Sequence, residues 1–246
     1  MNSRLYKLLK LGQSIWLDNI SRELIKSGEL KKLIDIGIRG VTSNPTIFEK
    51  AILSSNDYDE SILNLGTKSS SIDEILESLM IVDITEACDI FFDVYNSSEG
   101  NDGFVSIEVS PLLAYNSDET IETVNRLWNV INRPNVMIKI PATKPGLKAI
   151  EESIYKGINV NVTLIFSIER YKEVTEAYLK GIERRIAEGL EVSKINSVAS
   201  VFVSRIDTIV DNEIVKLINQ GKPELTKYLG KTAIANTRLL YQEFKK

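Results

Sequence analysis

The chain has 246 residues, of which 43% are hydrophobic and 26% are charged, and these proportions predict one globular α/β domain with one large core. Its net charge is -4, and Lys and Arg are interspersed with Asp and Glu, which excludes a nucleic-acid surface but not a pocket for a small anion. The chain contains no histidine, which excludes Ser-His-Asp and Cys-His catalysis and the commonest metal ligand.

Short β-like runs alternate with longer amphipathic segments along the chain. The six runs occupy residues 14–19, 40–45, 104–111, 136–142, 159–166 and 197–206. Helical patterns lie between them, for example at 118–131, with Asp118 as the expected N-cap, and at 167–189. This alternation of strand and helix predicts a parallel sheet.

A Ser- and Asn-rich stretch at 50–70 is expected to form an elaborated loop with short helices, inside a helical insertion around 50–98. The insertion holds the single cysteine, Cys88, in a helical pattern, which indicates a core thiol and excludes an intrachain disulfide or a zinc cluster. No signal peptide and no apolar run of about 18 residues is present, so we expect a soluble, cytoplasmic chain that does not bind a membrane. No linker divides the sequence, and residues 1–246 are predicted to form one domain.

Alternate residues of the six runs fall on two faces of the predicted sheet. One face is apolar and would lie under helices; it carries Ile15, Leu17, Val105, Ile107, Val109, Ile138, Ile140, Val160, Val162, Leu164, Val201 and Val203. The other face is mostly polar and carries Trp16, Asp18, Thr42, Asn44, Ser106, Glu108, Ser110, Met137, Lys139, Asn159, Asn161, Thr163, Ser200, Phe202 and Ser204. A doubly wound sheet would be apolar on both faces, whereas a (β/α) barrel lines its active site with inward residues near the strand ends, so a TIM-type barrel is predicted.

Lys139 lies inside the apolar run VMIKIPA, although lysine is among the residues least often buried. Desolvation disfavours the ammonium form of a lysine and leaves an amine that can condense with a ketone to give a Schiff base. The resulting iminium makes the adjacent carbon–carbon bond breakable. Such chemistry needs one carboxylate to take a hydroxyl proton and an acid–base group for carbinolamine dehydration, and Asp18 and Glu108 suit these tasks without a metal or cofactor.

The same residues also have purely structural interpretations. Lys139 could extend to solvent from a sheet edge, and Glu108 could be its ion-pair partner without any catalysis. Asp18 could cap a helix, and Asn44 before a proline could belong to an ordinary turn. Their coincidence on one face at the strand ends favours a functional cluster.

Five segments, in order and across nearly the whole chain, resemble motifs of the transaldolase family. They are IWLDNISRELIKSGELKKLI, GVTSNPTIFEKAI, VMIKIPATKPGLKAI, NVNVTLIFSIERY and VFVSRID. TSNPT and IKIPAT are especially specific, whereas SIERY and the insertion around 50–98 are similar to the longer bacterial transaldolases rather than to the short fructose-6-phosphate aldolases. The resemblance departs from the family after residue 206, because only helical patterns follow and no seventh or eighth strand is found.

The resemblance also implies a role for each polar residue. Lys139 matches the Schiff-base lysine, and Asp18 matches the carboxylate that deprotonates the C4 hydroxyl of the donor. Glu108 is similar to the acid that, with Thr163, holds the water relaying protons during iminium formation and release. The substrate-binding residues implied are Asn44 and Asn161 as amides on the dihydroxyacetone unit, Thr42, Ser106 and Ser200 in the pocket lining, Phe202 as a wall, and Arg205 on a phosphate.

The implied reaction belongs to the pentose phosphate pathway and takes sugar phosphates as substrates. It moves a dihydroxyacetone unit from sedoheptulose 7-phosphate or fructose 6-phosphate to an aldose phosphate, by ping-pong kinetics through an enamine on Lys139. Glu108 stands where the short aldolases generally carry glutamine, which favours transfer over simple aldol cleavage. An aldolase of the fructose-6-phosphate type and a weak or inactive truncated relative stay open as alternatives.

The missing strands raise a further expectation. Six strands cannot close an eight-stranded barrel, so the chain is expected to be a natural fragment, one half of a split enzyme or a non-catalytic relative. Unpaired edges at the first and last strands predict association, either as a homo-oligomer or with a complementing C-terminal polypeptide.

Overall fold

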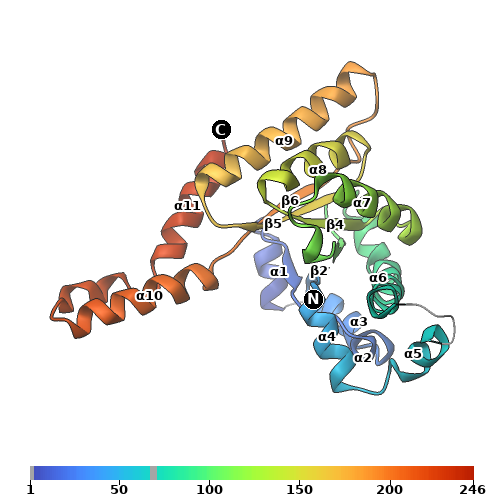
Figure 1. Ribbon diagram of the computed structural model, residues 1–246, viewed down its shortest axis with the longest axis horizontal. Coiled ribbons are helices and arrows are strands. Elements are labelled where there is room, and N and C mark those ends of the chain that lie inside the picture. Colours follow the sequence, from blue (N-terminus) through green and yellow to red (C-terminus); the bar gives the residue numbers. More distant parts are fainter. Residues whose placement is uncertain (1–2, 67–70) are drawn as a thin grey trace.

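The computed structural model describes residues 3–66 and 71–246 of the chain. Its central feature is a curled sheet of six parallel strands, each paired with the next in sequence (Figure 1). The strands are β1 (Ile15–Leu17), β2 (Ile38–Thr42), β3 (Val105–Glu108), β4 (Val136–Pro141), β5 (Val160–Ile165) and β6 (Ser197–Val201). A sheet in which each strand pairs in parallel with the next strand in sequence has the topology of a (β/α) barrel. The predicted fold class is therefore confirmed, as an incomplete barrel.

Helices connect the strands and form the rest of the described chain. They are α1 (Arg4–Leu9), α2 (Arg22–Lys26), α3 (Glu29–Ile36), α4 (Pro45–Ser54), α5 (Asp59–Gly66), α6 (Ile72–Ser97), α7 (Ser117–Ile131), α8 (Lys144–Tyr155), α9 (Ile168–Ala187), α10 (Ser204–Asn219) and α11 (Thr232–Phe244), with short 3-10 helices at Pro111–Leu113 and Pro223–Tyr228. Helices α4, α5 and α6 occupy the region of the predicted insertion, of which residues 67–70 lie outside the described part.

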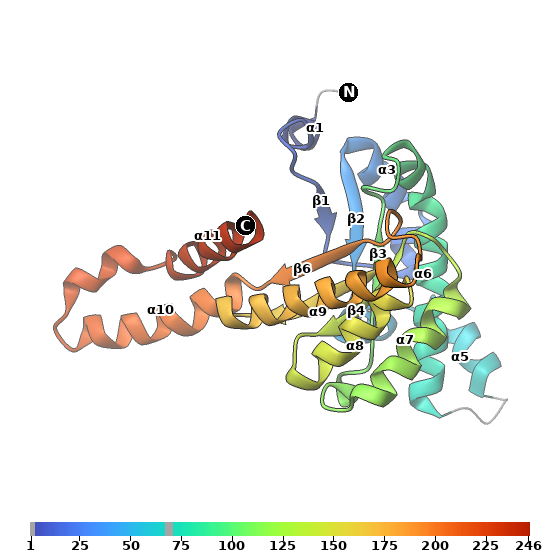
Figure 2. The same cartoon turned by 90° about the horizontal axis from the view of Figure 1, so that it is seen from above.

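The core lies between the convex face of the sheet and the helices packed against it. Helices α3, α6, α7, α8 and α9 contact strands β2 to β5 from this side (Figure 2). The predicted apolar face supplies the buried strand residues, among which Ile107, Ile138, Ile140 and Val160 have no exposed surface. Cys88, from α6, is also fully buried in this core, as predicted, and burial raises the pKa of its thiol.

The two outer strands are less covered than the strands between them. All six residues of β4 are buried, whereas every residue of β1 is half-buried and Ala199 of β6 is exposed. The described chain after Val201 is helical, and α10 and α11 project away from the sheet in both views (Figures 1 and 2). None of the helices in the described ranges is long and apolar enough to span a membrane.

The N-cap predicted for the helix at 118–131 was wrong. With Asp118 as the N-cap, the helix would begin at residue 119. Helix α7 begins at Ser117 instead, because the N-cap is Asn116, whose side chain accepts a hydrogen bond from the backbone N–H of Glu119. Asp118 lies in the first helical turn, where an acidic side chain interacts favourably with the helix dipole, and it pairs with Lys148 across 2.8 Å.

Some predicted strand ends and one predicted side-chain position also needed correction. Strand β2 ends at Thr42 because Asn44 caps α4, and β6 ends at Val201, so that Val203 and Ser204 lie at the start of α10 instead of in the sheet. Leu164 does not take the predicted place on the apolar face of β5. It has a left-handed φ of 61°, the pairing with β6 shifts register there, and Ile165 fills the core position.

A buried ionic cluster ties the start of α2 to α6. The Arg22 guanidinium donates to Asp83 Oδ1 at 3.0 Å, and both residues are nearly inaccessible to solvent. Tyr58 donates its hydroxyl to the other Asp83 oxygen at 2.8 Å and accepts the backbone N–H of Arg22. Burial raises the pKa of Tyr58 above its ordinary value, so the phenol stays a donor. Arg22 Nη1 also bonds Ser61 at 2.8 Å, which leaves the cluster well satisfied.

We expect Asp83→Asn to lower the free energy of unfolding by about 3–5 kcal/mol, because it leaves the buried Arg22 charge without its carboxylate. Glu77→Gln is the matched control in the same helix, since it breaks an ion pair with the half-exposed Arg126 and should cost only about 0–1 kcal/mol. Urea unfolding of the three proteins, with similar m values, measures the difference. A cost for Asp83→Asn no larger than that of Glu77→Gln would show that the cluster does not hold α2 to α6.

Candidate active site

Strand register brings the predicted polar residues into rows on the concave face of the sheet. Across β2, β3 and β4, Thr42 lies opposite Ser106, and Glu108 lies opposite Lys139. Across β4 and β5, Lys139 lies opposite Asn161, and Pro141 lies opposite Thr163. Because parallel strands end at the same edge, these side chains form one cluster near the carboxyl ends.

Lys139 points into this cluster and not toward solvent. The residue is 6% exposed, and its Nζ lies 3.2 Å from Glu108 Oε2 and donates to the backbone carbonyl of Ser43 at 3.1 Å. The alternative in which Lys139 extends from a sheet edge is therefore wrong, since β4 has a strand on each side. The ion pair with Glu108 is present, and it is compatible with both the catalytic and the structural interpretation.

Glu108 sits among charges that oppose one another. Burial raises the pKa of its carboxyl, whereas the Lys139 and Arg205 cations lower it and the Asp18 carboxylate raises it. The net direction is upward, which brings the carboxyl closer to neutral pH and suits a group that both gives and takes a proton. The same balance shows that Asp18 and Arg205 lie near enough to act on this site, although both residues are exposed.

Hydrogen bonds join the predicted substrate-binding residues of three strands. Ser200 donates its hydroxyl to Asn161 Oδ1 at 2.8 Å, and Asn161 Nδ2 donates to the Ser106 hydroxyl at 3.0 Å. Thr42 faces the same region, and its buried hydroxyl has no hydrogen-bond partner among the described residues. A hollow of about 510 Å³ is lined by Thr42, Asn161 and Ser200 and also by residues at the amino ends of the strands, such as Ser14, Phe104 and Ser197. Lys139 and Glu108 do not line it, so this hollow lies beside the cluster, toward the opposite end of the strands.

Thr163 is 1% exposed and lies next to the strained residue of β5. Its carbonyl accepts the N–H of Ala142 at 2.8 Å, so the strand is still paired with β4 at this point. At the left-handed Leu164 the pairing with β6 shifts register, and it resumes with Ile165 opposite Val201. Strain in a non-glycine residue costs roughly 1–3 kcal/mol and is concentrated at functional sites, which agrees with the place of Thr163 in the cluster.

The remaining predicted residues lie around the rim. Asn44 caps α4 through its side-chain oxygen, which accepts the Ile47 N–H at 3.0 Å, so a ligand contact falls to its Nδ2 donor. The Phe202 and Phe166 ring centroids lie 5.2 Å apart with the rings tilted by 31°, and the Arg205 guanidinium lies 4.6 Å from the Phe202 ring centroid. The roles assigned to these residues stay predictions.

Sequence reasoning missed two residues at the site. Ser43 supplies the carbonyl that accepts from Lys139, and Phe166, at the carboxyl end of β5, forms an aromatic pair with Phe202. Ser43 lies between Thr42 and Asn44 and so alternates to the opposite face from them, which is why it was not among the predicted site residues; its full burial is visible only in the structure. Phe166 could not be recognised from the sequence as a site residue, because an aromatic residue after an apolar run is typical of the hydrophobic core.

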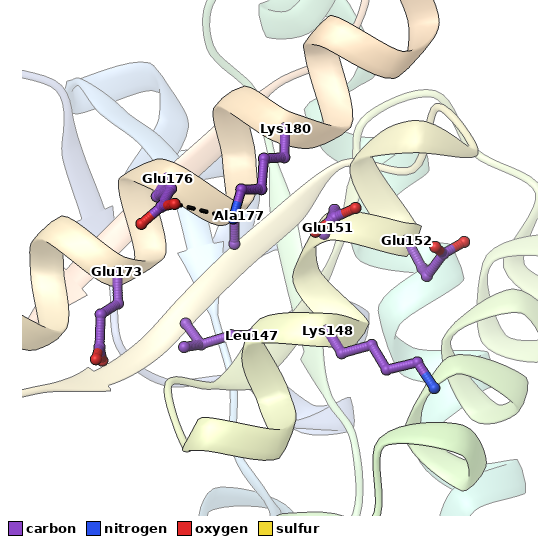
Figure 3. A pocket seen from close by; sticks show the side chains of 8 residues that line it. All are labelled: Leu147, Lys148, Glu151, Glu152, Glu173, Glu176, Ala177 and Lys180. Carbon is purple, nitrogen blue, oxygen red and sulfur yellow. Dashed lines mark ion pairs between the residues drawn. The ribbon is translucent and has the colours of Figure 1, made fainter.

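A second hollow, of about 440 Å³, lies outside the barrel in the groove between α8 and α9 (Figure 3). It carries carboxylates from both helices, and its cations are already engaged: Lys180 pairs with Glu176 at 2.9 Å and Lys148 with Asp118 at 2.8 Å. Side chains of this kind form a solvated helix surface. The chemistry of the cluster on the concave face has no counterpart in this groove.

The cluster combines the parts that imine chemistry needs. A buried lysine, a carboxyl of raised pKa 3.2 Å away and an amide–hydroxyl network lie on one face, with a second carboxylate, Asp18, at the rim. Lysine can attack a carbonyl carbon, and the carboxyl groups can move the protons that addition and dehydration require.

Comparison with known proteins agrees with this chemistry. The family described as transaldolase/fructose-6-phosphate aldolase matches residues 15–246. A transaldolase of Trichodesmium erythraeum is 49% identical over 253 residues, which cover 100% of this chain and 66% of that protein. Transaldolase 2 of Nostoc sp. is 47% identical over 252 residues (99% and 66%), and a transaldolase of Saccharopolyspora erythraea is 48% identical over 244 residues (99% and 65%). The chain thus spans about 66% of the length of these curated relatives.

Proposed function

We propose a transaldolase function for this chain, which belongs to the transaldolase/fructose-6-phosphate aldolase family. The observation that carries the proposal is the buried Lys139 amine, held between the Glu108 carboxyl and the Ser43 carbonyl in an interior lined with hydroxyl and amide groups. The substrates we propose are ketose phosphates such as sedoheptulose 7-phosphate or fructose 6-phosphate as donors, and an aldose phosphate as acceptor, in the pentose phosphate pathway.

In the proposed mechanism, Lys139 attacks the ketose carbonyl, and Glu108 supplies the proton that lets the carbinolamine oxygen leave as water. Asp18 then takes the C4 hydroxyl proton, which breaks the bond between C3 and C4 and leaves an enamine on Lys139. Addition of this enamine to the acceptor aldehyde and hydrolysis of the new imine complete the transfer. Asn44 and Asn161 bind the dihydroxyacetone hydroxyls, Thr163 holds the water, and Arg205 binds the phosphate.

Glu108 is the feature that favours transfer over a simple aldolase reaction. The residue is a carboxylic acid of raised pKa beside Lys139, where the short aldolases of the family generally carry glutamine. In the addition step Asp18 gives its proton to the oxygen of the acceptor aldehyde, as the reverse of cleavage requires, and Glu108 keeps its role in imine formation and hydrolysis. This assignment makes the aldolase interpretation the second candidate.

The first test is covalent trapping. Borohydride reduction in the presence of fructose 6-phosphate should attach the sugar-derived unit to Lys139, as mapped by peptide mass spectrometry, because only an imine at this position is formed and reduced. Lys139→Arg keeps the charge and should give no adduct, whereas Lys148→Arg, on the exposed face of α8, should leave trapping unchanged. An adduct on another lysine in a folded, substrate-saturated sample would contradict the proposal.

The second test separates the two carboxylates. Asp18→Asn should leave the trapped adduct intact and slow carbon–carbon cleavage by about 10²–10⁴-fold, because its proton transfer follows imine formation. Glu108→Gln should instead slow adduct formation and raise the ratio of aldol cleavage to transfer. Trapping rates and product ratios measure both effects. Equal loss of adduct formation in the two variants would show that the division of roles is wrong.

We also propose that the open edges of the sheet bind a polypeptide that supplies further strands, as the family resemblance implies. Strands β1 and β6 each pair on one side only within the described residues, and large apolar side chains are exposed in the chain that follows β6, among them Val203, Ile209 of α10 and Ile234 of α11. Unpaired edges and exposed apolar surface are both sites of association.

The isolated chain is therefore expected to associate with itself or to form a one-to-one complex with a polypeptide that corresponds to the remaining third of the longer transaldolases. Sedimentation velocity of the chain alone and of the mixture distinguishes the two states. Turnover should be slow in the isolated chain and rise in the mixture, because Arg205 is the one cation among the described residues to which the resemblance assigns phosphate binding. A monodisperse monomer with full transaldolase activity would refute this expectation.

A further inference from the structure

We propose that Ser43 is a positioning residue that orients the Lys139 amine for attack on the substrate carbonyl. The inference rests on the proposed function, because it assigns Lys139 as the nucleophile. Ser43 itself lies outside the reaction pocket: its side chain is directed to the backbone of β3, and its contact with Lys139 is made by its main-chain carbonyl.

The geometry forms a short chain of buried hydrogen bonds. Lys139 Nζ donates to the Ser43 carbonyl at 3.1 Å, and the Ser43 hydroxyl donates to the Ser106 carbonyl at 2.6 Å. Ser43 and Ser106 have no exposed surface. Ser106 in turn accepts the Asn161 amide through its own hydroxyl at 3.0 Å. Strand β3 therefore holds Ser43 in place through the Ser106 carbonyl, and it also bonds Asn161 through the Ser106 hydroxyl.

The side-chain bond is needed because the strand pairing stops just before Ser43. The register between β2 and β3 runs through Val41 opposite Val105 and ends at Thr42 opposite Ser106. One residue further, Asn44 caps α4, which turns the chain away from the sheet. The Ser43 hydroxyl replaces a ladder bond at this turn, and without it the Ser106 carbonyl would lose a buried partner and the Ser43 carbonyl its anchor.

Two acceptors on the amine determine where its lone pair points. For attack, the Lys139 ammonium first gives a proton to the Glu108 carboxylate, which leaves an amine with two N–H bonds and one lone pair, and a Glu108 acid that can supply the later proton. If one N–H is directed to Ser43 and the other to Glu108, the lone pair faces the remaining direction, toward the interior network. Orientation of a nucleophile in this way is a large part of catalysis by proximity.

The Ser43 carbonyl also stabilises the iminium intermediate. Attack forms the bond between Nζ and the substrate carbon and breaks the carbonyl π bond, and one N–H proton passes to the new oxygen. Departure of that oxygen as water takes a second proton, from Glu108, and leaves an iminium with one N–H. Because Glu108 is occupied with proton transfer, the Ser43 carbonyl accepts the remaining iminium N–H, and it stabilises the positive charge through a charge-assisted bond.

The experiment compares two buried serines of the same kind. Ser43→Ala removes the anchoring hydroxyl, whereas Ser153→Ala removes a hydroxyl that is 2% exposed and donates to the Ala149 carbonyl at the same distance, 2.6 Å, inside α8. Borohydride trapping at saturating fructose 6-phosphate should slow roughly 10- to 100-fold in Ser43→Ala, with the half-saturating sugar concentration little changed. Ser153→Ala should trap at the normal rate, and thermal unfolding of both variants shows whether their losses of stability are alike.

Two further measurements keep the inference separate from the proposed function. Ser43→Thr retains a hydroxyl and should restore most of the trapping rate in a folded sample. Reductive methylation with formaldehyde and cyanoborohydride, quantified at Lys139 by mass spectrometry, needs no sugar and should also be slower in Ser43→Ala than in Ser153→Ala. Failure of the wild-type chain to react with the sugar, with this methylation difference present, would overturn the function and keep the positioning role. Lys139 methylation that is as fast in Ser43→Ala as in Ser153→Ala would overturn the positioning role.

Discussion

Burial of one positive charge on the concave face is the constraint on which this site depends. An ammonium group taken out of water costs several kcal/mol unless acceptors surround it. Lys139 meets this requirement with one carboxylate and one main-chain carbonyl, from β3 and from the turn after β2. Both acceptors are available only because neighbouring parallel strands end at the same level, so the fold and the reactivity of the lysine have a common cause.

The sequence predicted the strands and the polar face because both follow from side-chain alternation, which is local. All six strands and the pairing of Lys139 with Glu108 were confirmed. Side-chain alternation does not indicate at which residue a strand ends. The left-handed Leu164, the turn at Ser43 and the early end of β6 depend on how each strand meets the next helix. Ser43 was missed for that reason, since its contact with Lys139 runs through a backbone atom, and every residue type has a carbonyl.

The insertion and the site show two different uses of buried charge. In the cluster of Arg22, Asp83 and Tyr58, each carboxylate oxygen has a donor and the phenol both donates and accepts a hydrogen bond. On the concave face, the buried Thr42 hydroxyl has no hydrogen-bond partner in the described part of the chain, and a hollow lies beside it. A polar cluster that is complete by itself holds helices together, whereas one that is incomplete is arranged for something that binds.

The buried and the exposed residues of the site belong to different strands of the open sheet. Glu108, Lys139 and Asn161 lie on β3, β4 and β5, which have a strand on each side, so the covalent part of the site is supported by the most buried strands. Asp18 follows β1, and Arg205 follows β6, and within the described residues these two strands are paired on one side only. Both residues are exposed, and their charges act on Glu108 with opposite signs. A polypeptide that covered both edges, as proposed, would desolvate the two charges together and strengthen two effects on Glu108 that oppose each other, so closing the barrel and completing the charged surroundings of the nucleophile would be one event.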